Sequence, residues 1–259
     1  MKIGLTLSVG GARGIAHLSV LKFLEKHNIK IDMVSGASMG SIVGGLYSLG
    51  YSITELENFV NSLTKKDAKK ILDFTIPKES LLKGEGVKEY LKYLFKDATF
   101  DNLKIPFYPV ATDLVSGKPV VISEGYLWEA VYASSAIPGF FKPLKLRDMI
   151  LVDGGVANPI PIDVIRHKVD FLIASRIIPQ YDNLKLTGKI LSLYYVLRSL
   201  SIVEASLSEN ILEKNPPDFL VDFKNIISFN VFSFEKGKDI LKFSDKFVEK
   251  NMQALLSKL

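Results

Sequence analysis

The sequence Ile31-Asp32-Met33-Val34-Ser35-Gly36-Ala37-Ser38-Met39-Gly40 carries the strongest structural signal in this chain. Apolar residues lead into a Gly-x-Ser-x-Gly pentapeptide, and small and apolar residues follow it over 41–47. This order predicts a strand, a tight turn and a helix, the setting in which such a pentapeptide presents a nucleophile. We expect a strained backbone at Ser38, at the N-terminus of the helix, while Gly36 and Gly40 let strand and helix pass closely. The competing interpretation is a glycine-rich turn with an inert serine, because short motifs also occur by chance.

Strands and helices alternate on both sides of this turn. Residues 2–8 predict a first strand, which ends in a glycine-rich loop over 9–14, followed by a helix that stops near residue 27. This βαβα beginning predicts a parallel sheet core. The later elements that we expect are helices over 52–73 and 85–96 with irregular chain between them, strands over 105–112 and 119–122, a helix over 125–134, a hairpin over 145–152, a short helix over 161–167, a strand over 169–175, a helix over 187–214, a strand over 218–222 and a helix over 236–256.

Composition limits the classes of protein to which the chain can belong. Its 259 residues are 47% hydrophobic and 24% charged, as in ordinary soluble enzymes, and the length suits a single domain over 1–259. We expect a helical cap over 52–96, inserted after the nucleophile helix. The chain has no cysteine, which excludes disulfides, thiol nucleophiles and thiolate metal sites. With only three histidines, we expect no metal site.

Charge and hydropathy indicate where the protein acts. We see no signal peptide and no apolar run long enough to span a membrane, so we expect a cytoplasmic protein, with a peripheral position at the membrane left open. The net charge of +5 comes from scattered lysines, which favour contact with anionic headgroups only weakly. No basic stripe interleaved with aromatic residues is present, so we expect no nucleic-acid partner. The oligomeric state stays open.

The glycine-rich loop Val9-Gly10-Gly11-Ala12-Arg13-Gly14 follows a strand and opens a helix, so its backbone amides are unpaired and point forward. Such amides could hold a phosphate or the oxyanion of an acyl-transfer intermediate. A dinucleotide site would need a glycine at position 9 and an acidic residue at a strand end about 20 residues later. Position 9 is Val, and Asp32 lies at a strand start, so we favour the oxyanion site.

A third motif, Asp153-Gly154-Gly155, ends the predicted hairpin. Alone it reads more simply as a turn, because Asp-Gly is a common turn sequence. With the other two motifs it predicts one site, because strand C-termini share an edge of a parallel sheet. Ser38 would attack an ester carbonyl, Asp153 would accept its proton, and the amides of Gly10, Gly11 and Ala12 would hold the oxyanion. A carboxylate is a weak base, so burial would have to raise the pKa of Asp153.

Together these stretches resemble the patatin-like phospholipase family over nearly the whole chain. The resemblance lies in LSVGGARG over 7–14, GASMG over 36–40, YASSAIPGFF over 132–141 and VDGGVANPIP over 152–161. It implies a three-layer α/β/α fold with a mainly parallel central sheet, and a lipid acyl hydrolase of the phospholipase A, lysophospholipase or esterase type without cofactor. It also implies Ser38 as nucleophile, Asp153 as base, and the loop with Arg13 and Gly14 as the oxyanion region. Val9 departs from the glycine usual in the family; we expect it to end the strand without disturbing the loop.

Several other residues allow two interpretations. Arg13 could contact a phosphate headgroup or steady the loop. His17 could face the site, but a buried packing role suits it better, and His167 could complete a Ser-Asp-His triad, although its position near a helix end suits a surface role better. The remaining groups are the aromatic and apolar residues Tyr90, Tyr93, Leu94 and Phe95, either an acyl-chain surface or core, and the lysines Lys65, Lys66, Lys69 and Lys70, either a solvated face or a headgroup patch.

Two further functions stay open beside a lipid acyl hydrolase of lipid metabolism or degradation. One is a non-catalytic lipid-binding or regulatory protein on the same fold. The other is a soluble carboxylesterase or thioesterase without preference for a lipid interface.

Overall fold

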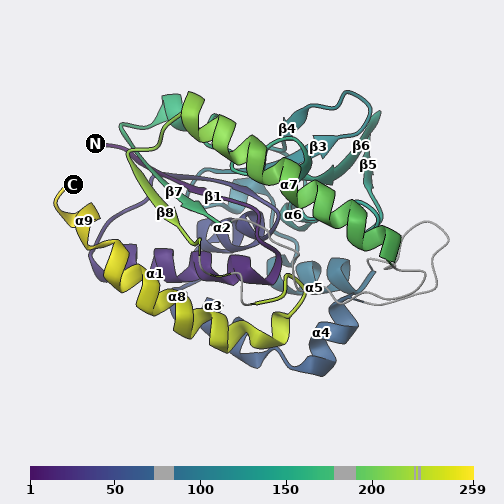
Figure 1. Ribbon diagram of the computed structural model, residues 1–259, viewed down its shortest axis with the longest axis horizontal. Coiled ribbons are helices and arrows are strands. Elements are labelled where there is room, and N and C mark those ends of the chain that lie inside the picture. The colour runs from purple at the N-terminus through teal and green to yellow at the C-terminus, as the bar shows by residue number, and fades with distance from the viewer. Residues whose placement is uncertain (73–84, 178–190, 225, 227–228) are drawn as a thin grey trace.

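The structure, a computed structural model, describes residues 1–72, 85–177, 191–224, 226 and 229–259. Its centre is a mixed sheet with helices on both faces (Figure 1). The strands are β1 (Ile3–Leu7), β2 (Met33–Ala37), β3 (Phe107–Asp113), β4 (Pro119–Val121), β5 (Leu144–Leu146), β6 (Met149–Asp153), β7 (Phe171–Arg176) and β8 (Phe219–Asp222). Their order is β5-β6-β3-β2-β1-β7-β8, and β4 pairs with β3.

The sheet is parallel at its core and antiparallel at one side. Strands β3, β2, β1, β7 and β8 run parallel, while β4, β5 and β6 pair antiparallel with their neighbours. With the helices on both faces, this confirms the predicted α/β/α fold with a mainly parallel sheet.

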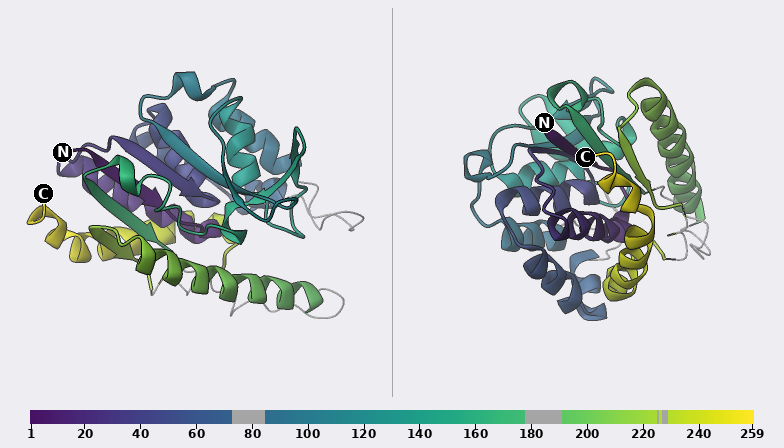
Figure 2. Two further views of the ribbon diagram at one scale, coloured as in Figure 1. Left: turned by 90° about the horizontal axis from the view of Figure 1, so that it is seen from above. Right: turned by 90° about the vertical axis from the view of Figure 1, so that its left-hand side faces the viewer.

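Helices cover the two faces unequally (Figure 2). The larger core packs α1, α2 and α8 against residues such as Leu5, Leu7 and Ile173, which point to one face. On the other face, Leu172 and Ala174 of β7 pack with residues of α7. The helices are α1 (His17–Lys26), α2 (Met39–Leu49), α3 (Ile53–Ser62), α4 (Lys65–Leu72), α5 (Glu85–Phe95), α6 (Leu127–Ser134), α7 (Leu191–Lys214), α8 (Gly237–Asn251) and α9 (Gln253–Leu256).

Three helix predictions differ from the structure. The helix expected over 52–73 divides into α3 and α4, because Thr64 begins a new helix by accepting a hydrogen bond from the Asp67 amide. The closing helix divides at Met252 into α8 and α9. The short helix over 161–167 is wrong: turns there lead into one 3-10 turn, η4 (Arg166–Lys168), and Val169 returns to extended backbone before β7.

Two expectations fall wholly or partly outside the described residues: the irregular chain after residue 73 and the start of the helix expected at 187. The segment 52–96 contains α3, α4 and α5, and its role as a cap stays a prediction, as does the single domain over 1–259. No helix in the described part of the chain is both long and apolar enough to cross a bilayer.

The register of the sheet explains how an antiparallel hairpin reaches the site. Pairing between β2 and β3 ends at Ala37 and Val110, but β3 continues beyond that point. Strand β6 pairs with this extension and runs back along it until Asp153 lies opposite Ala111. The C-terminus of β6 therefore arrives one position beyond the end of β2, which Ser38 follows.

Two close backbone contacts fix the turn at Ser38. A Cβ atom on Gly40 would lie 2.3 Å from the carbonyl oxygen of Leu7 and 2.5 Å from that of Ser8. A Cβ atom on Gly36 would lie 2.6 Å from the carbonyl oxygen of Gly40. The start of α2 therefore passes directly over the end of β1, as the pentapeptide predicts, and only glycine fits at these positions.

We expect Gly40→Ala to lower the free energy of unfolding by more than about 2 kcal/mol, because the added methyl group meets backbone atoms of β1 that cannot turn aside. Urea denaturation measures this loss. The control is Gly117→Ala, where φ is positive, unlike at Gly40, but no atom lies within 4 Å of the added Cβ, so only about 1 kcal/mol of backbone strain is expected. Equal losses in the two variants would contradict the packing explanation.

Candidate active site

Ser38 sits at the N-terminus of α2 in a backbone conformation that few side chains adopt. Its φ of 54° and ψ of −126° match the strained turn that the sequence predicts. Its amide donates to the carbonyl oxygen of Ser134 at 3.0 Å and to Oγ of the same residue at 3.1 Å. The Ser134 hydroxyl in turn donates to the carbonyl oxygen of Val110. The turn is thus held by α6 and β3, and its amide is not available to a substrate.

Asp153 meets Ser38 directly. The Ser38 hydroxyl donates to Asp153 Oδ2 at 2.7 Å, and the Gly155 amide donates to Oδ1 at 2.8 Å. The Asp153 amide donates to the carbonyl oxygen of Ala136, which fixes the end of β6. Both side chains are buried, with 6% of Ser38 and 4% of Asp153 exposed. The two residues expected to act as nucleophile and base are therefore in contact.

Burial changes the acidity of this carboxyl group. The loss of water around Asp153 raises its pKa to about 6, although the hydrogen bonds from Gly155 and Ser38 act in the opposite direction. Near neutral pH the group is thus mainly ionised, yet basic enough to accept a proton from a hydroxyl. This meets the requirement that the sequence places on Asp153.

The glycine loop lies beside Ser38 and differs from expectation in one amide. It continues into a 3-10 turn, η1 (Gly11–Ala16), in which the Ala12 amide donates to the carbonyl oxygen of Val231 at 2.7 Å. Ala12 is therefore not free to hold an oxyanion in this arrangement. No residue in the described ranges accepts a hydrogen bond from the amides of Gly10 or Gly11. These two amides are the donors that the loop offers.

Arg13 and Gly14 stabilise the loop. The Arg13 side chain is buried, and its Nε donates to the carbonyl oxygen of Phe229. With the bond from Ala12 to Val231, this ties the loop to a segment far away in the chain. A Cβ on Gly14 would lie 2.4 Å from Met39 Cγ, so glycine is needed where η1 crosses α2. The burial of Arg13 favours a loop-steadying role over contact with a lipid headgroup.

Val9 lies two residues beyond the end of β1, and its effect on the loop stays a prediction. Its amide donates to the carbonyl oxygen of Pro159 at 3.0 Å, and its side chain is buried. A Cβ on Gly155 would lie 2.9 Å from Val9 Cγ1, so this side chain packs beside Gly155. Gly154 is equally constrained, since a Cβ there would lie 2.1 Å from the carbonyl oxygen of Val110.

The histidines lie away from the Ser38 hydroxyl. His17 Nε2 donates to the carbonyl oxygen of Ser8, which leaves Nδ1 to accept from the Ser175 hydroxyl. Burial lowers the pKa of His17 to about 4, so it is a neutral brace behind the loop. His167 is exposed in η4, which precedes β7. It therefore lies at the N-terminal ends of the parallel strands, whereas Ser38 lies at their C-terminal ends. The structure does not bring it into a triad.

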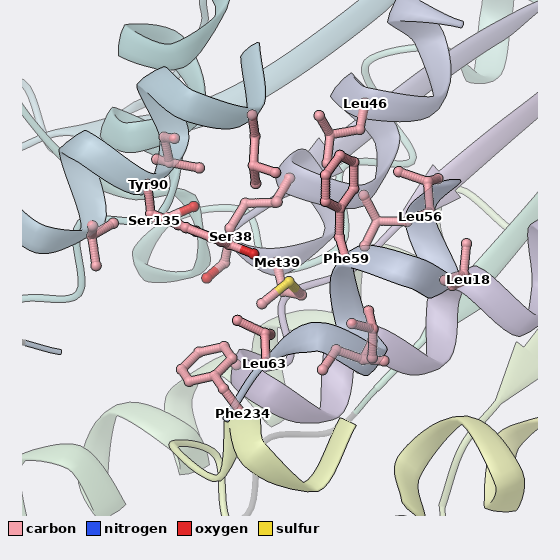
Figure 3. A pocket seen from close by; sticks show the side chains of 18 of the residues that line it. Leu18, Ser38, Met39, Leu46, Leu56, Phe59, Leu63, Tyr90, Ser135 and Phe234 are labelled. Atoms are coloured by element: carbon pink, nitrogen blue, oxygen red, sulfur yellow. The ribbon is translucent and has the colours of Figure 1, made fainter. Parts of the chain in front are cut away.

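An apolar pocket begins at Ser38 (Figure 3). In this view Ser38 and Ser135 lie on one side, and Leu18 and Leu56 lie on the other. Helices α1 and α2 form one wall, while α3 and α5 from the 52–96 segment form another. The lining includes Ile15, Met39, Ile42, Leu46, Phe59, Val87, Tyr90, Leu91 and Leu94.

The aromatic residues and lysines singled out in the sequence lie in different surroundings. Tyr90 and Leu94 line the pocket, Phe95 is buried in the core, and Tyr93 is 66% exposed. Lys65 and Lys66 are exposed at the start of α4, as expected of a solvated face. Lys69 and Lys70 belong to a stretch whose side chains are not described. In the described ranges no three histidine or acidic side chains gather as metal ligands.

Sequence reasoning missed one acidic residue. Glu204 of α7 is 5% exposed and lies against Gly155 on the inward side of the helix. Its neighbours on that side, Leu197, Ser201 and Ser208, are also buried. The spacing of these four residues is helical, but serine and glutamate at such positions ordinarily predict a solvated face. No sequence signal therefore identified this buried carboxyl group.

Comparison with known proteins adds the family. The sequence model described as "Patatin-like phospholipase" matches residues 5–166. An uncharacterized NTE family protein of Mycobacterium tuberculosis is 35% identical over 161 residues, which cover 62% of this chain and 44% of that protein. Human patatin-like phospholipase domain-containing protein 6 is 33% identical over 169 residues, 63% of this chain and 12% of that protein. The chain thus spans less than half of the curated relatives it matches.

A solved structure shows the same fold at low sequence identity. VipD from Legionella pneumophila superposes with a TM-score of 0.50 and 13% identity, over 96% of this chain and 67% of that chain.

We expect Asp153→Asn to be more stable than the wild type at neutral pH. The pKa of Asp153 is raised in the folded protein, so the folded state holds the proton more tightly, and wild-type stability falls as pH rises from about 4 to about 6. Asparagine does not ionise, so the variant avoids this loss, which is at most about 3 kcal/mol. Denaturation at several pH values measures the difference, which should vanish below about pH 4.

Asp113→Asn is the matched control. Its hydrogen bonds, chiefly from Ser116, lower the pKa of Asp113, so this carboxylate stabilises the fold above its unfolded pKa. The control variant should therefore be less stable than the wild type at neutral pH, and the gap should close in acid. The same sign of pH dependence in both variants would contradict the effect assigned to burial of Asp153.

Proposed function

The chain belongs to the patatin-like phospholipase family, and from that premise we propose that it is a serine acyl hydrolase acting on phospholipid, lysophospholipid or related acyl esters. One observation carries the proposal: the 2.7 Å hydrogen bond from Ser38 to the buried Asp153, at an apolar pocket. The name of the human relative, which contains a phospholipase domain, agrees with this substrate class.

In the first half of the cycle, Ser38 Oγ attacks the carbonyl carbon of the ester, and its proton passes to Asp153 Oδ2. The amides of Gly10 and Gly11 and the N-terminus of α2 stabilise the oxyanion. Collapse of this intermediate breaks the ester bond, and the alcohol leaves with the proton from Asp153. The product on the enzyme is an acyl ester of Ser38.

In the second half, water attacks the acyl-enzyme and gives its proton to Asp153. The second oxyanion collapses, the fatty acid leaves, and Ser38 Oγ regains the proton. No other group needs to change its protonation state, which suits a site whose base is a single carboxylate with a pKa of about 6.

The pocket supports a long acyl substrate. Its walls are almost wholly hydrophobic and begin at the nucleophile, so an acyl chain whose ester lies at Ser38 would be removed from water. We include transient contact with a membrane surface in the proposal, because such substrates reside there. A cytoplasmic location stays a prediction.

We expect Ser38→Ala to lower kcat/KM for p-nitrophenyl acyl esters at least about a thousandfold, because the nucleophile is lost. Asp153→Asn should be nearly as damaging, since asparagine cannot accept the proton. His167→Ala, the control, should retain wild-type activity because His167 is exposed at the opposite ends of the parallel strands from Ser38. Labelling by a fluorophosphonate, mapped to its peptide, gives a second measurement.

Turnover that survives in Ser38→Ala would reject this mechanism. Lipid binding by the wild type without turnover or labelling would instead favour the non-catalytic lipid-binding protein. A chain-length series measured with and without phospholipid vesicles separates a lipase from a soluble carboxylesterase or thioesterase, which would show no gain at the interface.

We expect Val87→Trp to shift activity toward shorter acyl chains, because Val87 lines the pocket from α5 and a larger side chain would shorten the space for the substrate. Activity on long-chain esters should fall about tenfold or more relative to butyrate esters. Glu89→Trp is the control: it lies on the same helix, is exposed and does not line this pocket. An unchanged chain-length profile in Val87→Trp would mean that the acyl chain binds elsewhere.

A further inference from the structure

Helix α7 presents a carboxyl group to the catalytic dyad that Ser38 and Asp153 form. Glu204 lies on the inward side of the helix, 5% exposed, against the 3-10 turn η3 (Gly154–Val156) that directly follows Asp153. The mechanism above gives it no role. A buried acidic side chain costs free energy unless it is paired or neutral, so its presence beside the base needs an explanation.

The contacts around Gly155 show how close the two carboxyl groups are. A Cβ atom on Gly155 would lie 2.5 Å from Glu204 Oε1 and 3.1 Å from Asp153 Oδ1. Both oxygens therefore border the same small space beside Gly155, with Val9 completing its wall. In such a space, two negative charges with no cation between them repel strongly.

Hydrogen bonds favour the ionised form of Asp153 over the ionised form of Glu204. Asp153 accepts from the Gly155 amide and the Ser38 hydroxyl, both of which favour its ionised form. Glu204 Oε2 is buried and has no hydrogen-bond partner in the part of the chain that the structure describes. The proton of the pair is thus more stable on Glu204 than on Asp153.

We propose that Glu204 is a positioning residue that holds its own proton at neutral pH and so keeps Asp153 as the charged partner able to accept the proton of Ser38. The inference rests on the proposed function. If the proton lay on Asp153 instead, Oδ2 could not accept another, and the attack by Ser38 would lose its base. The neutral Glu204 also fills the space behind Gly155 and so keeps the Gly155 amide on Asp153.

Among the described residues, Asp153 is the charged group that acts on Glu204. Burial and the Asp153 charge both raise the pKa of Glu204. The Arg198 guanidinium donates to the hydroxyl of Ser201 on its own helix, and Glu209 is exposed and pairs with Arg176. The charged groups of the elements around Glu204 are Asp153 before η3, Arg13 in the glycine loop, and Arg198, Glu209, Glu213 and Lys214 along α7.

The test compares the full chain with Glu204→Gln, which keeps the shape of the side chain and is neutral at every pH. The free energy of unfolding is measured by denaturant from about pH 4 to about pH 8. A glutamate that is protonated when folded must ionise on unfolding above about pH 4.5. The unfolding constant of the wild type should therefore rise relative to the variant by about tenfold for each pH unit in this range.

A control and a kinetic measurement accompany this experiment. Ser208→Ala removes another buried polar group one turn along α7 and should show a difference from the wild type that does not depend on pH. The pH profile of kcat/KM should keep its acid-side midpoint near pH 6 in Glu204→Gln, because glutamine has the same charge as protonated Glu204. Glu204→Met should give the same midpoint even if it is less stable.

Two results would overturn the proposal. A stability difference between the wild type and Glu204→Gln that stays constant above pH 5 would mean that folded Glu204 is ionised. A fall of the acid-side midpoint by about one pH unit or more in Glu204→Gln would mean that the proton of the pair lay on Asp153. If the wild type hydrolyses no ester, the proposed function fails, whereas the unfolding experiment still decides the protonation of Glu204.

Discussion

The hydrogen bond between Ser38 and Asp153 joins two turns that are 115 residues apart, and most of the local structure serves to bring them together. Each turn is fixed by a backbone contact that excludes a side chain: Gly40 against the end of β1, and Gly154 against β3. These contacts lie in the sheet and at the start of α2. The geometry of the dyad therefore depends on strand register and glycine packing more than on the two side chains themselves.

Burial raises the pKa of Asp153, which makes it a better base, and it also lowers the stability of the fold. The same loss of water that raises its pKa to about 6 works against folding wherever the unfolded carboxylate would ionise. The positive φ of Ser38, the hydrogen-bond partner of Asp153, adds backbone strain. Such costs must be offset elsewhere, and the large apolar core shared by α1, α2 and α8 is the obvious source of that free energy.

How much of this could be predicted from the sequence differs from residue to residue. The strand, turn and helix around Ser38 follow from the pentapeptide, because each step has a local cause in chain geometry. The role of β3 does not, since nothing in residues 107–113 shows that the strand outruns β2 and carries β6 back to the site. The Ala12 amide is similar: its acceptor, Val231, is more than two hundred residues away. Glu204 lies beyond sequence reasoning altogether, because only the orientation of α7 turns a polar helix face inward.

The pocket shows another limit of prediction from sequence, since its lining residues are apolar and helically spaced like those of any core. Leu91 and Leu94 are buried and line the pocket, so neither periodicity nor burial separates a pocket wall from packed core. What separates them is position relative to Ser38, which the sheet edge sets. The dyad and its amides stand on β2, β6 and the glycine loop, whereas much of the wall belongs to α3 and α5. Because these are different elements, the length and shape of the pocket can change through the 52–96 segment while the reacting atoms keep their positions.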